Sequence, residues 1–322
     1  MIPLLRRLPE LPRVLTLLFL LSAAPLTTAG EYTTHTLQVG DRERQYALYW
    51  PDSAPTDRPA AAIIAYHGFM SDPSGMRWLT KADPAADAFG FVIVYPQAID
   101  GSFNAGRGSG TRESDVDEAA FIDALLKHIP NAHNLDKRNL FTMGFSNGAQ
   151  MSALMWCNYA GRIRGAAIVA HSLNITPCEP KRPVPIVLMQ GAKDPYVPFG
   201  GGGPYDLRSH KASLAELKRL HAVQGEGDIV VDLKTIRCRN FEDRVRSCVG
   251  YADGHTWPGA LEFQPEQFGL TNTEVVANEF IMSFFTEIAD NQQTTGTGVL
   301  GWLKRLFAGL IPKQNADQEN AS

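Results

Sequence analysis

The chain has 322 residues, of which 44% are hydrophobic and 20% are charged, and its formal net charge is -4. This composition is typical of a globular protein with a substantial core. The slight negative charge gives no general attraction for nucleic acid, and no cluster of Lys and Arg inside the domain suggests such a partner. Small molecules or neutral polymers are therefore the expected ligands.

The first residues resemble an export signal. Residues 1–29 begin with arginines, continue into an apolar run over 14–21, and end in small residues up to Ala29. This order of charge, apolar core and cleavage region predicts a secretory signal peptide. The run is shorter than the roughly 20 residues that a membrane helix needs, although an N-terminal anchor is the alternative. We expect a mature domain over residues 30–289, located in the periplasm or outside the cell.

Strand-like and helix-like segments alternate along this domain. Polar and apolar residues alternate over 32–39 and 44–50, which predicts an opening hairpin. Continuous apolar runs of strand length follow, as expected for strands covered on both faces. The expected strands are 60–66, 91–95, 140–144, 164–170, 185–190, 228–237 and 244–251, and the expected helices are 75–88, 115–129, a segment from Ser146 to about 159, 213–224 and 272–289. The pattern predicts an α/β fold with a mostly parallel central sheet and helices on both faces, whose site lies beyond the carboxyl ends of the strands.

The end of the chain differs in composition from the domain. Residues 290–322 begin as a polar linker, and apolar residues then recur around Lys304 and Arg305 over 299–311. This spacing predicts a short amphipathic helix with a basic face. Such a helix can make weak contact with an anionic membrane surface, or dock on the domain or on a partner.

Four cysteines lie within the domain, at Cys157, Cys178, Cys238 and Cys248. An even number of cysteines after an export signal favours two disulfides. Three pairings are possible, and we prefer the local one, which joins Cys157 to Cys178 and Cys238 to Cys248. The sequence contains no C-x-x-C and no histidine at zinc-like spacing from a cysteine pair, so we expect no metal site.

A G-x-S-x-G pattern occupies the centre of the chain. It consists of Gly144, Phe145, Ser146, Asn147 and Gly148, between a predicted strand and a predicted helix. That context places a serine on a strained turn from strand to helix, where flanking side chains would collide. Ser146 is therefore a candidate nucleophile.

A nucleophilic serine needs a base and an acid. His255 follows a predicted strand near the end of the domain, and Asp194 directly follows another. The order serine, acid, histidine is the order of the α/β-hydrolases, in which the acid orients the imidazole. His171 also follows a strand, and Asp253 is a rival acid two residues before His255. We expect Asp194 and His255 to act with Ser146.

Two backbone N–H groups should stabilise the oxyanion that forms during ester cleavage. One belongs to the residue after the nucleophile, Asn147, and the other to a loop after an early strand. His67, Gly68 and Phe69 close the strand 60–66 and supply that loop. Gly68 permits the tight turn and the Phe69 amide is the expected second donor, whereas His67 is expected to be structural.

These motifs carry a resemblance to a known family. The matching blocks are His67-Gly68 with its loop, 95–96 with the loop of Ser102-Phe103-Asn104, residues 144–149, and Asp194 with Gly254-His255-Thr256-Trp257-Pro258-Gly259. Together they resemble the secreted esterase family of polyhydroxybutyrate depolymerases and feruloyl esterases, which has the α/β-hydrolase fold. The resemblance spans roughly residues 60–259, and the block ending at Gly259 is its most specific part.

The resemblance implies a role for each of these residues. Ser146 would be the nucleophile, Asp194 the acid and His255 the base. Phe103 and Trp257 would contact the substrate, with a core position as the alternative for Trp257.

Three positions depart from the family pattern. Family members often have Cys or Gly at the position of Phe69, His before Gly191, and Trp at the position of Phe103. Because these positions surround the acyl or alcohol pocket, they leave the substrate open.

We therefore expect an exported serine hydrolase of carboxylic esters that uses no cofactor. Its substrate would be a small or polymeric ester. A non-catalytic hydrolase-fold protein that binds a component of the cell envelope is one alternative. A serine peptidase on the same fold is the other, and turnover of amides would distinguish it.

Overall fold

The computed structural model describes residues 30–106 and 115–290 of the chain. The predicted signal peptide over 1–29 and the predicted amphipathic helix over 299–311 lie outside these residues. Among the helices that are described, none combines the length and the apolar content that crossing a bilayer requires.

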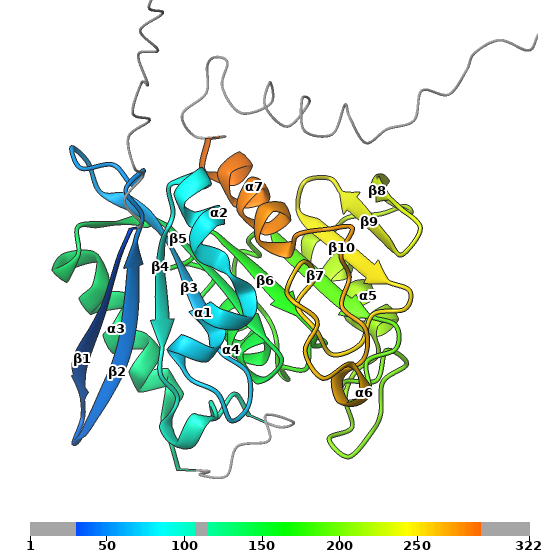
Figure 1. The fold of residues 1–322 in the computed structure, drawn as a ribbon, viewed down its shortest axis with the longest axis horizontal. Helices are drawn as coiled ribbons and strands as arrows, with labels where there is room; N and C mark the ends of the chain where they lie inside the picture. The colour runs from blue at the N-terminus through cyan, green and yellow to red at the C-terminus, as the bar shows by residue number, and fades with distance from the viewer. Residues whose placement is uncertain (1–29, 107–114, 291–322) are drawn as a thin grey trace, which may run out of the picture.

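The described residues form one mixed sheet of ten strands (Figure 1), in the order β1-β2-β4-β3-β5-β6-β7-β10-β9-β8. The strands from β4 to β10 in this order are parallel, and antiparallel strands extend the sheet at both edges. The bounds are β1 (Glu31–Val39), β2 (Arg42–Trp50), β3 (Ala60–Tyr66), β4 (Val92–Pro96), β5 (Leu135–Phe145), β6 (Gly165–Val169), β7 (Ile186–Gly191), β8 (Asp228–Asp232), β9 (Ile236–Phe241) and β10 (Val245–Gly250). The predicted parallel centre of the sheet is confirmed.

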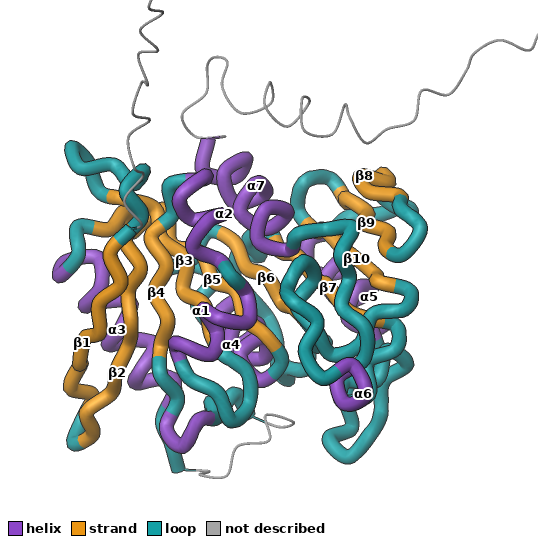
Figure 2. Tube along the Cα trace, viewed as in Figure 1, coloured by secondary structure: helices purple, strands orange, loops and turns teal. Residues whose placement is uncertain are grey.

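Helices cover both faces of this sheet. The bounds are α1 (Pro73–Thr80), α2 (Ala82–Phe89), α3 (Glu118–Ala132), α4 (Asn147–Asn158), α5 (His210–His221), α6 (Pro265–Phe268) and α7 (Ala277–Asp290), with a 3-10 turn η1 (Ile99–Gly101). Helices α1, α2 and α7 lie on one face, and α3, α4 and α5 lie on the other (Figures 1 and 2). An apolar layer packs between the sheet and each set of helices. Within β3, Ile63 belongs to the first layer and Ile64 to the second, so this strand is apolar throughout because it is buried on both faces.

Most predicted elements have bounds that differ from those in the structure, and two predicted elements are divided. The helix expected over 75–88 is two helices, which meet at Lys81 in a left-handed conformation with φ 48°. Pro84 explains the break, because it has no N–H to donate to residue 80 and its ring would clash there. The strand expected over 228–237 is divided between β8 and β9. The helix expected from residue 272 begins at Ala277, because the Asn272 side chain accepts backbone N–H bonds and holds a turn before it.

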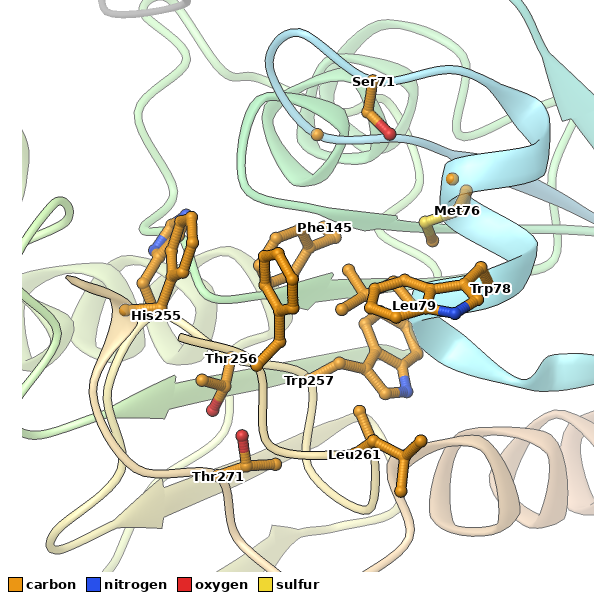
Figure 3. Close-up of a pocket in the computed structure, with 15 residues that line it drawn as sticks. Ser71, Met76, Trp78, Leu79, Phe145, His255, Thr256, Trp257, Leu261 and Thr271 are labelled. Carbon is orange, nitrogen blue, oxygen red and sulfur yellow. The ribbon is translucent and has the colours of Figure 1, made fainter. Parts of the chain in front are cut away.

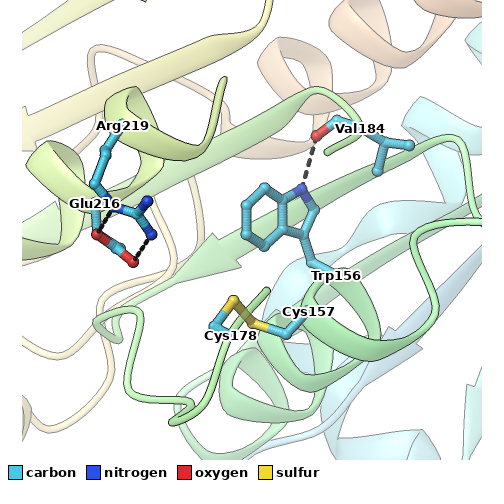
Figure 4. Close-up of a disulfide and its surroundings, with 6 residues drawn as sticks. All are labelled: Trp156, Cys157, Cys178, Val184, Glu216 and Arg219. Carbon is cyan, nitrogen blue, oxygen red and sulfur yellow. Dashed lines mark hydrogen bonds and ion pairs between the residues drawn. A yellow bond between two sulfur atoms is a disulfide. The ribbon is translucent and has the colours of Figure 1, made fainter. Parts of the chain in front are cut away.

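Both disulfides have the local pairing that the sequence favoured. Cys157, at the end of α4, is bonded to Cys178 in the segment after β6 (Figure 4). Cys238 and Cys248 face each other across β9 and β10. The first disulfide fixes the helix that follows Ser146, and the second fixes the strand that leads to His255.

Candidate active site

Ser146 lies at a sharp turn between β5 and α4. Its backbone angles are φ 54° and ψ -118°, which an L-residue adopts only under strain. The flanking glycines make the turn sterically feasible. A Cβ on Gly144 would lie 2.0 Å from the carbonyl oxygen of Gly148, and a Cβ on Gly148 would lie 2.1 Å from that of Tyr66. The G-x-S-x-G pattern therefore encodes close packing of β3, β5 and α4 as well as the position of the serine.

Ser146, His255 and Asp194 form a continuous hydrogen-bonded line. His255 Nε2 lies 2.8 Å from Ser146 Oγ, and His255 Nδ1 lies 2.8 Å from Asp194 Oδ2. The other carboxylate oxygen of Asp194 accepts the backbone N–H groups of Tyr196 and Val197, each at 2.8 Å. The Asp194 side chain is fully buried. The structure thus brings together the three side chains that the sequence selected.

Asp253, the rival acid, has a different place in the structure. Its side chain is buried and accepts a hydrogen bond from Asn272 at 3.2 Å, and burial raises its pKa to about 6. Its backbone carbonyl accepts the N–H of Lys193, next to Asp194. Asp253 thus connects the loop of the acid to the loop of His255.

The predicted oxyanion donors lie beside the serine. Phe69 and Asn147 line the same cavity as Ser146. His67 braces the loop of Phe69, since its Nδ1–H donates to the Gly68 carbonyl at 2.8 Å and its Nε2 accepts the N–H of Ala98 at 3.1 Å. Burial lowers the pKa of His67 to about 4, which keeps the ring neutral and suits both bonds. His67 thus has the structural role that we expected, since both of its ring nitrogens bond backbone groups.

Phe103 is not one of the residues that line the cavity of Ser146. Its ring is fully buried and packs against Tyr66 and His67, with centroid distances of 5.2 and 4.7 Å. The prediction that Phe103 contacts the substrate is therefore wrong. Its ring instead packs against His67, which holds the loop of Phe69. Both backbone groups of Phe103 bond the Asn147 side chain, at 2.8 Å to Oδ1 and 3.0 Å from Nδ2. The sequence did not predict this clamp.

An aromatic pocket of about 250 Å³ opens on one side of His255 (Figure 3). Its walls come from α1, from Phe145 and from the segment 256–271. Trp257 forms part of the wall, but its side chain is fully buried and its indole N–H is sealed from solvent without a partner among the described residues. Trp257 is thus both a core residue and a wall of the pocket. Trp78 and Phe263 contact each other at the rim and are about half exposed.

A second cavity, the nucleophile cleft, has a volume of about 460 Å³ and shares His255 with the aromatic pocket. Ser146, the two predicted oxyanion residues and His171 line it together with Tyr196 and Phe268. Sequence reasoning missed these last two aromatic residues. Tyr196 could have been found, because it is the second residue after the candidate acid. Phe268 lies on the four-residue helix α6, which has no motif of its own.

Comparison with known proteins finds a family match over part of the chain. Residues 44–179 match the family model described as Esterase PHB depolymerase. Over these residues the chain is similar to that esterase family, and it shares the α/β-hydrolase fold with solved esterases. The part of the chain that matches contains the Phe69 loop and Ser146, whereas Asp194 and His255 lie beyond it.

Individual relatives support the same assignment. A protein of Nocardia uniformis subsp. tsuyamanensis named "Putative esterase NocK" is 24% identical over 285 residues, which cover 78% of this chain and 82% of that protein. Feruloyl esterase B of Piromyces equi is 25% identical over 57% of this chain, and the match spans 36% of that enzyme's length. The solved acetyl xylan esterase from Aspergillus awamori shares the fold with a TM-score of 0.56 and 13% identity, over 73% of this chain and 97% of that one.

Proposed function

We propose that this protein is an exported serine hydrolase of carboxylic esters, with Ser146 as nucleophile, His255 as base and Asp194 as acid. The observation that carries the proposal is the hydrogen-bonded line from Ser146 Oγ through the imidazole to the buried carboxylate. A serine hydroxyl is a weak nucleophile unless a base takes its proton as it attacks. The intact line is what such activation requires, and it argues against a non-catalytic binding protein.

The reaction has two halves. Ser146 Oγ bonds to the ester carbonyl carbon while its proton passes to His255 Nε2, and the carbonyl oxygen becomes an oxyanion near the amides of Phe69 and Asn147. The intermediate then breaks its bond to the alcohol, which leaves with the proton from His255. Water attacks the acyl-enzyme in the same way, giving up a proton to His255, and releases the carboxylic acid and the free Ser146 hydroxyl.

The two cavities suit the two halves of an ester. His255 lines both the aromatic pocket and the nucleophile cleft, so groups on either side of the scissile bond have a place to bind. The relatives named feruloyl esterase and the family described as PHB depolymerase support two candidate substrate classes, feruloyl esters of sugars and oligomers of hydroxyalkanoates. The two disulfides support export, because such bonds persist in oxidising compartments.

The direct test uses Ser146→Ala with p-nitrophenyl butyrate as substrate. We expect hydrolysis to fall to the background rate while the thermal midpoint changes little, because the substitution removes one hydroxyl. Unchanged activity in this variant would remove Ser146 from the mechanism. A parallel screen of methyl ferulate against a hydroxybutyrate dimer then ranks the two substrate classes by kcat/KM.

A further inference from the structure

Four buried histidines besides His255 lie in the described part of the chain, at positions 67, 171, 210 and 221. Three of them have core environments that account for them. His67 and His210 each bond protein groups through both ring nitrogens. His221 has Nε2 sealed from solvent, and it does not line the nucleophile cleft. His171 differs from these three because it lines the nucleophile cleft.

The fold places His171 beside the nucleophile. β6 lies next to β5, with Val169 paired to Phe145, and the Ser146 N–H donates to the Val169 carbonyl at 3.0 Å. The chain then turns sharply at Ala170, where φ is 54°, and the next residue is His171. This neighbourhood is fixed by backbone hydrogen bonds of the sheet, so it does not depend on a flexible loop.

Hydrogen bonding defines which ring nitrogen of His171 carries a proton. Nδ1 lies 2.8 Å from the Ser172 carbonyl oxygen, which can only accept, so Nδ1 is the protonated nitrogen. Burial lowers the pKa of His171 to about 4, and the ring is therefore neutral at ordinary pH. Nε2 then has a free lone pair. Among the described residues it has no hydrogen-bond partner, and it is not one of the atoms sealed from solvent.

We propose that Nε2 of His171 accepts a hydrogen bond from a hydroxyl group of the substrate, and that the enzyme thereby selects hydroxylated esters. A lone pair cannot bind a carbonyl or ether oxygen, which are themselves acceptors, so it selects a group that carries a proton. Much of the surrounding wall is apolar, formed by residues such as Met70, Val197 and Phe268. A hydroxyl group that enters this cleft loses its hydrogen bonds to water. This loss costs free energy unless a protein group replaces those hydrogen bonds.

The inference rests on the proposed function, since it concerns the ester that Ser146 cleaves. The hydroxyl can belong to the acyl part or to the alcohol part of that ester. The hydrogen bond to His171 is the same in both cases, because the substrate contributes only an O–H donor to the lone pair of Nε2. Two pairs of substrates distinguish these sources. The acyl pair is methyl 3-hydroxybutyrate and methyl butyrate, and the alcohol pair is 2-hydroxyethyl butyrate and ethyl butyrate.

The test compares wild type with His171→Phe and His171→Gln. Both variants lose the bond to the Ser172 carbonyl, so they are matched for structural damage. Only Gln retains an acceptor near the position of Nε2. The measured quantity is the ratio of kcat/KM for the hydroxylated ester to that for its partner, because general damage lowers both values and leaves the ratio unchanged.

We expect wild type to favour the hydroxylated ester in one pair, and His171→Phe to lower that ratio about 5-fold, which corresponds to about 1 kcal/mol for one net hydrogen bond. His171→Gln should restore part of the ratio. Equal ratios in wild type and His171→Phe would overturn the role of His171. If wild type hydrolyses all four esters without preference, the inference fails and the proposed function stands. If it hydrolyses none of them, the proposed function fails as well.

Discussion

Replacing Asp194 by Asn should stop the reaction without disturbing the geometry of the site. Oδ1 of Asp194 accepts two backbone N–H groups, and Oδ2 faces Nδ1 of His255 at 2.8 Å. An amide NH₂ group cannot accept the two N–H bonds, so the oxygen of Asn must stay at the Oδ1 position. Its NH₂ group then faces Nδ1, which must become an acceptor. The ring proton therefore moves to Nε2, where it prevents the imidazole from taking the proton of Ser146.

The expected loss of kcat follows from the change of tautomer in the His255 imidazole. In serine hydrolases with this arrangement, the wrong tautomer lowers kcat by about 10⁴-fold, which is about 5 kcal/mol of activation free energy. We expect a loss of this size in kcat for p-nitrophenyl butyrate, with KM changed far less. The fold should survive, because Asn is nearly isosteric and keeps the backbone contacts. Circular dichroism and the thermal midpoint check this point.

Asp253→Asn is the matched control for this substitution. Asp253 is also buried and lies only two residues from His255, but its carboxyl group bonds Asn272. We expect this variant to keep kcat within a few fold of wild type. If Asp194→Asn kept most of its activity while Asp253→Asn lost it, the acid would have been assigned to the wrong residue.

Three further predictions concern the scaffold of the site. Gly148→Ala places a Cβ 2.1 Å from the Tyr66 carbonyl oxygen, so we expect little soluble, folded protein, and a normal yield of active enzyme would contradict the packing described. Glu118→Gln leaves the charge of Arg44 buried without its 3.0 Å partner, and urea unfolding should show a loss of about 3–5 kcal/mol that replacing both residues by apolar ones largely reverses. Burial raises the pKa of Asp253 from 3.8 to about 6, so its favourable contribution to stability is complete below pH 3.8 and is lost as the pH rises through 6. Asp253→Asn should therefore be more stable than wild type at pH 7, with a smaller gain at pH 4, and a gain independent of pH would argue against a raised pKa.

The centre of the fold was predictable from the sequence because its signals are local. A strand such as Ala60–Tyr66 is buried on both faces, so its apolar run is continuous and its bounds were predicted correctly. The opening hairpin, β1 and β2, was also predicted. The order of the strands in the sheet was not, since it depends on contacts between distant segments. The short turn between β8 and β9 also has no Gly, Pro or Asn to mark it.

The candidate site was predictable to a similar extent. The G-x-S-x-G pattern selected Ser146, and the order along the chain selected Asp194 and His255. The structure brings the three together because each follows a strand of the parallel centre, and the carboxyl ends of such strands meet at one edge. Phe103 was misplaced because a loop sequence does not say which way a side chain points. The sequence also could not show that Nε2 of His171 is free to accept a hydrogen bond. That property depends on the bond between Nδ1 and the Ser172 carbonyl, which only the structure shows.

The central claim is that Ser146 is an activated nucleophile, and covalent labelling tests it most directly. The mature protein is treated with a fluorophosphonate, and the modified peptide is identified by mass spectrometry. We predict a single adduct on Ser146 that is absent from Ser146→Ala and forms far more slowly in His255→Ala, although both variants remain folded. A folded wild-type protein that acquires no adduct, or acquires it on another residue, would contradict the account.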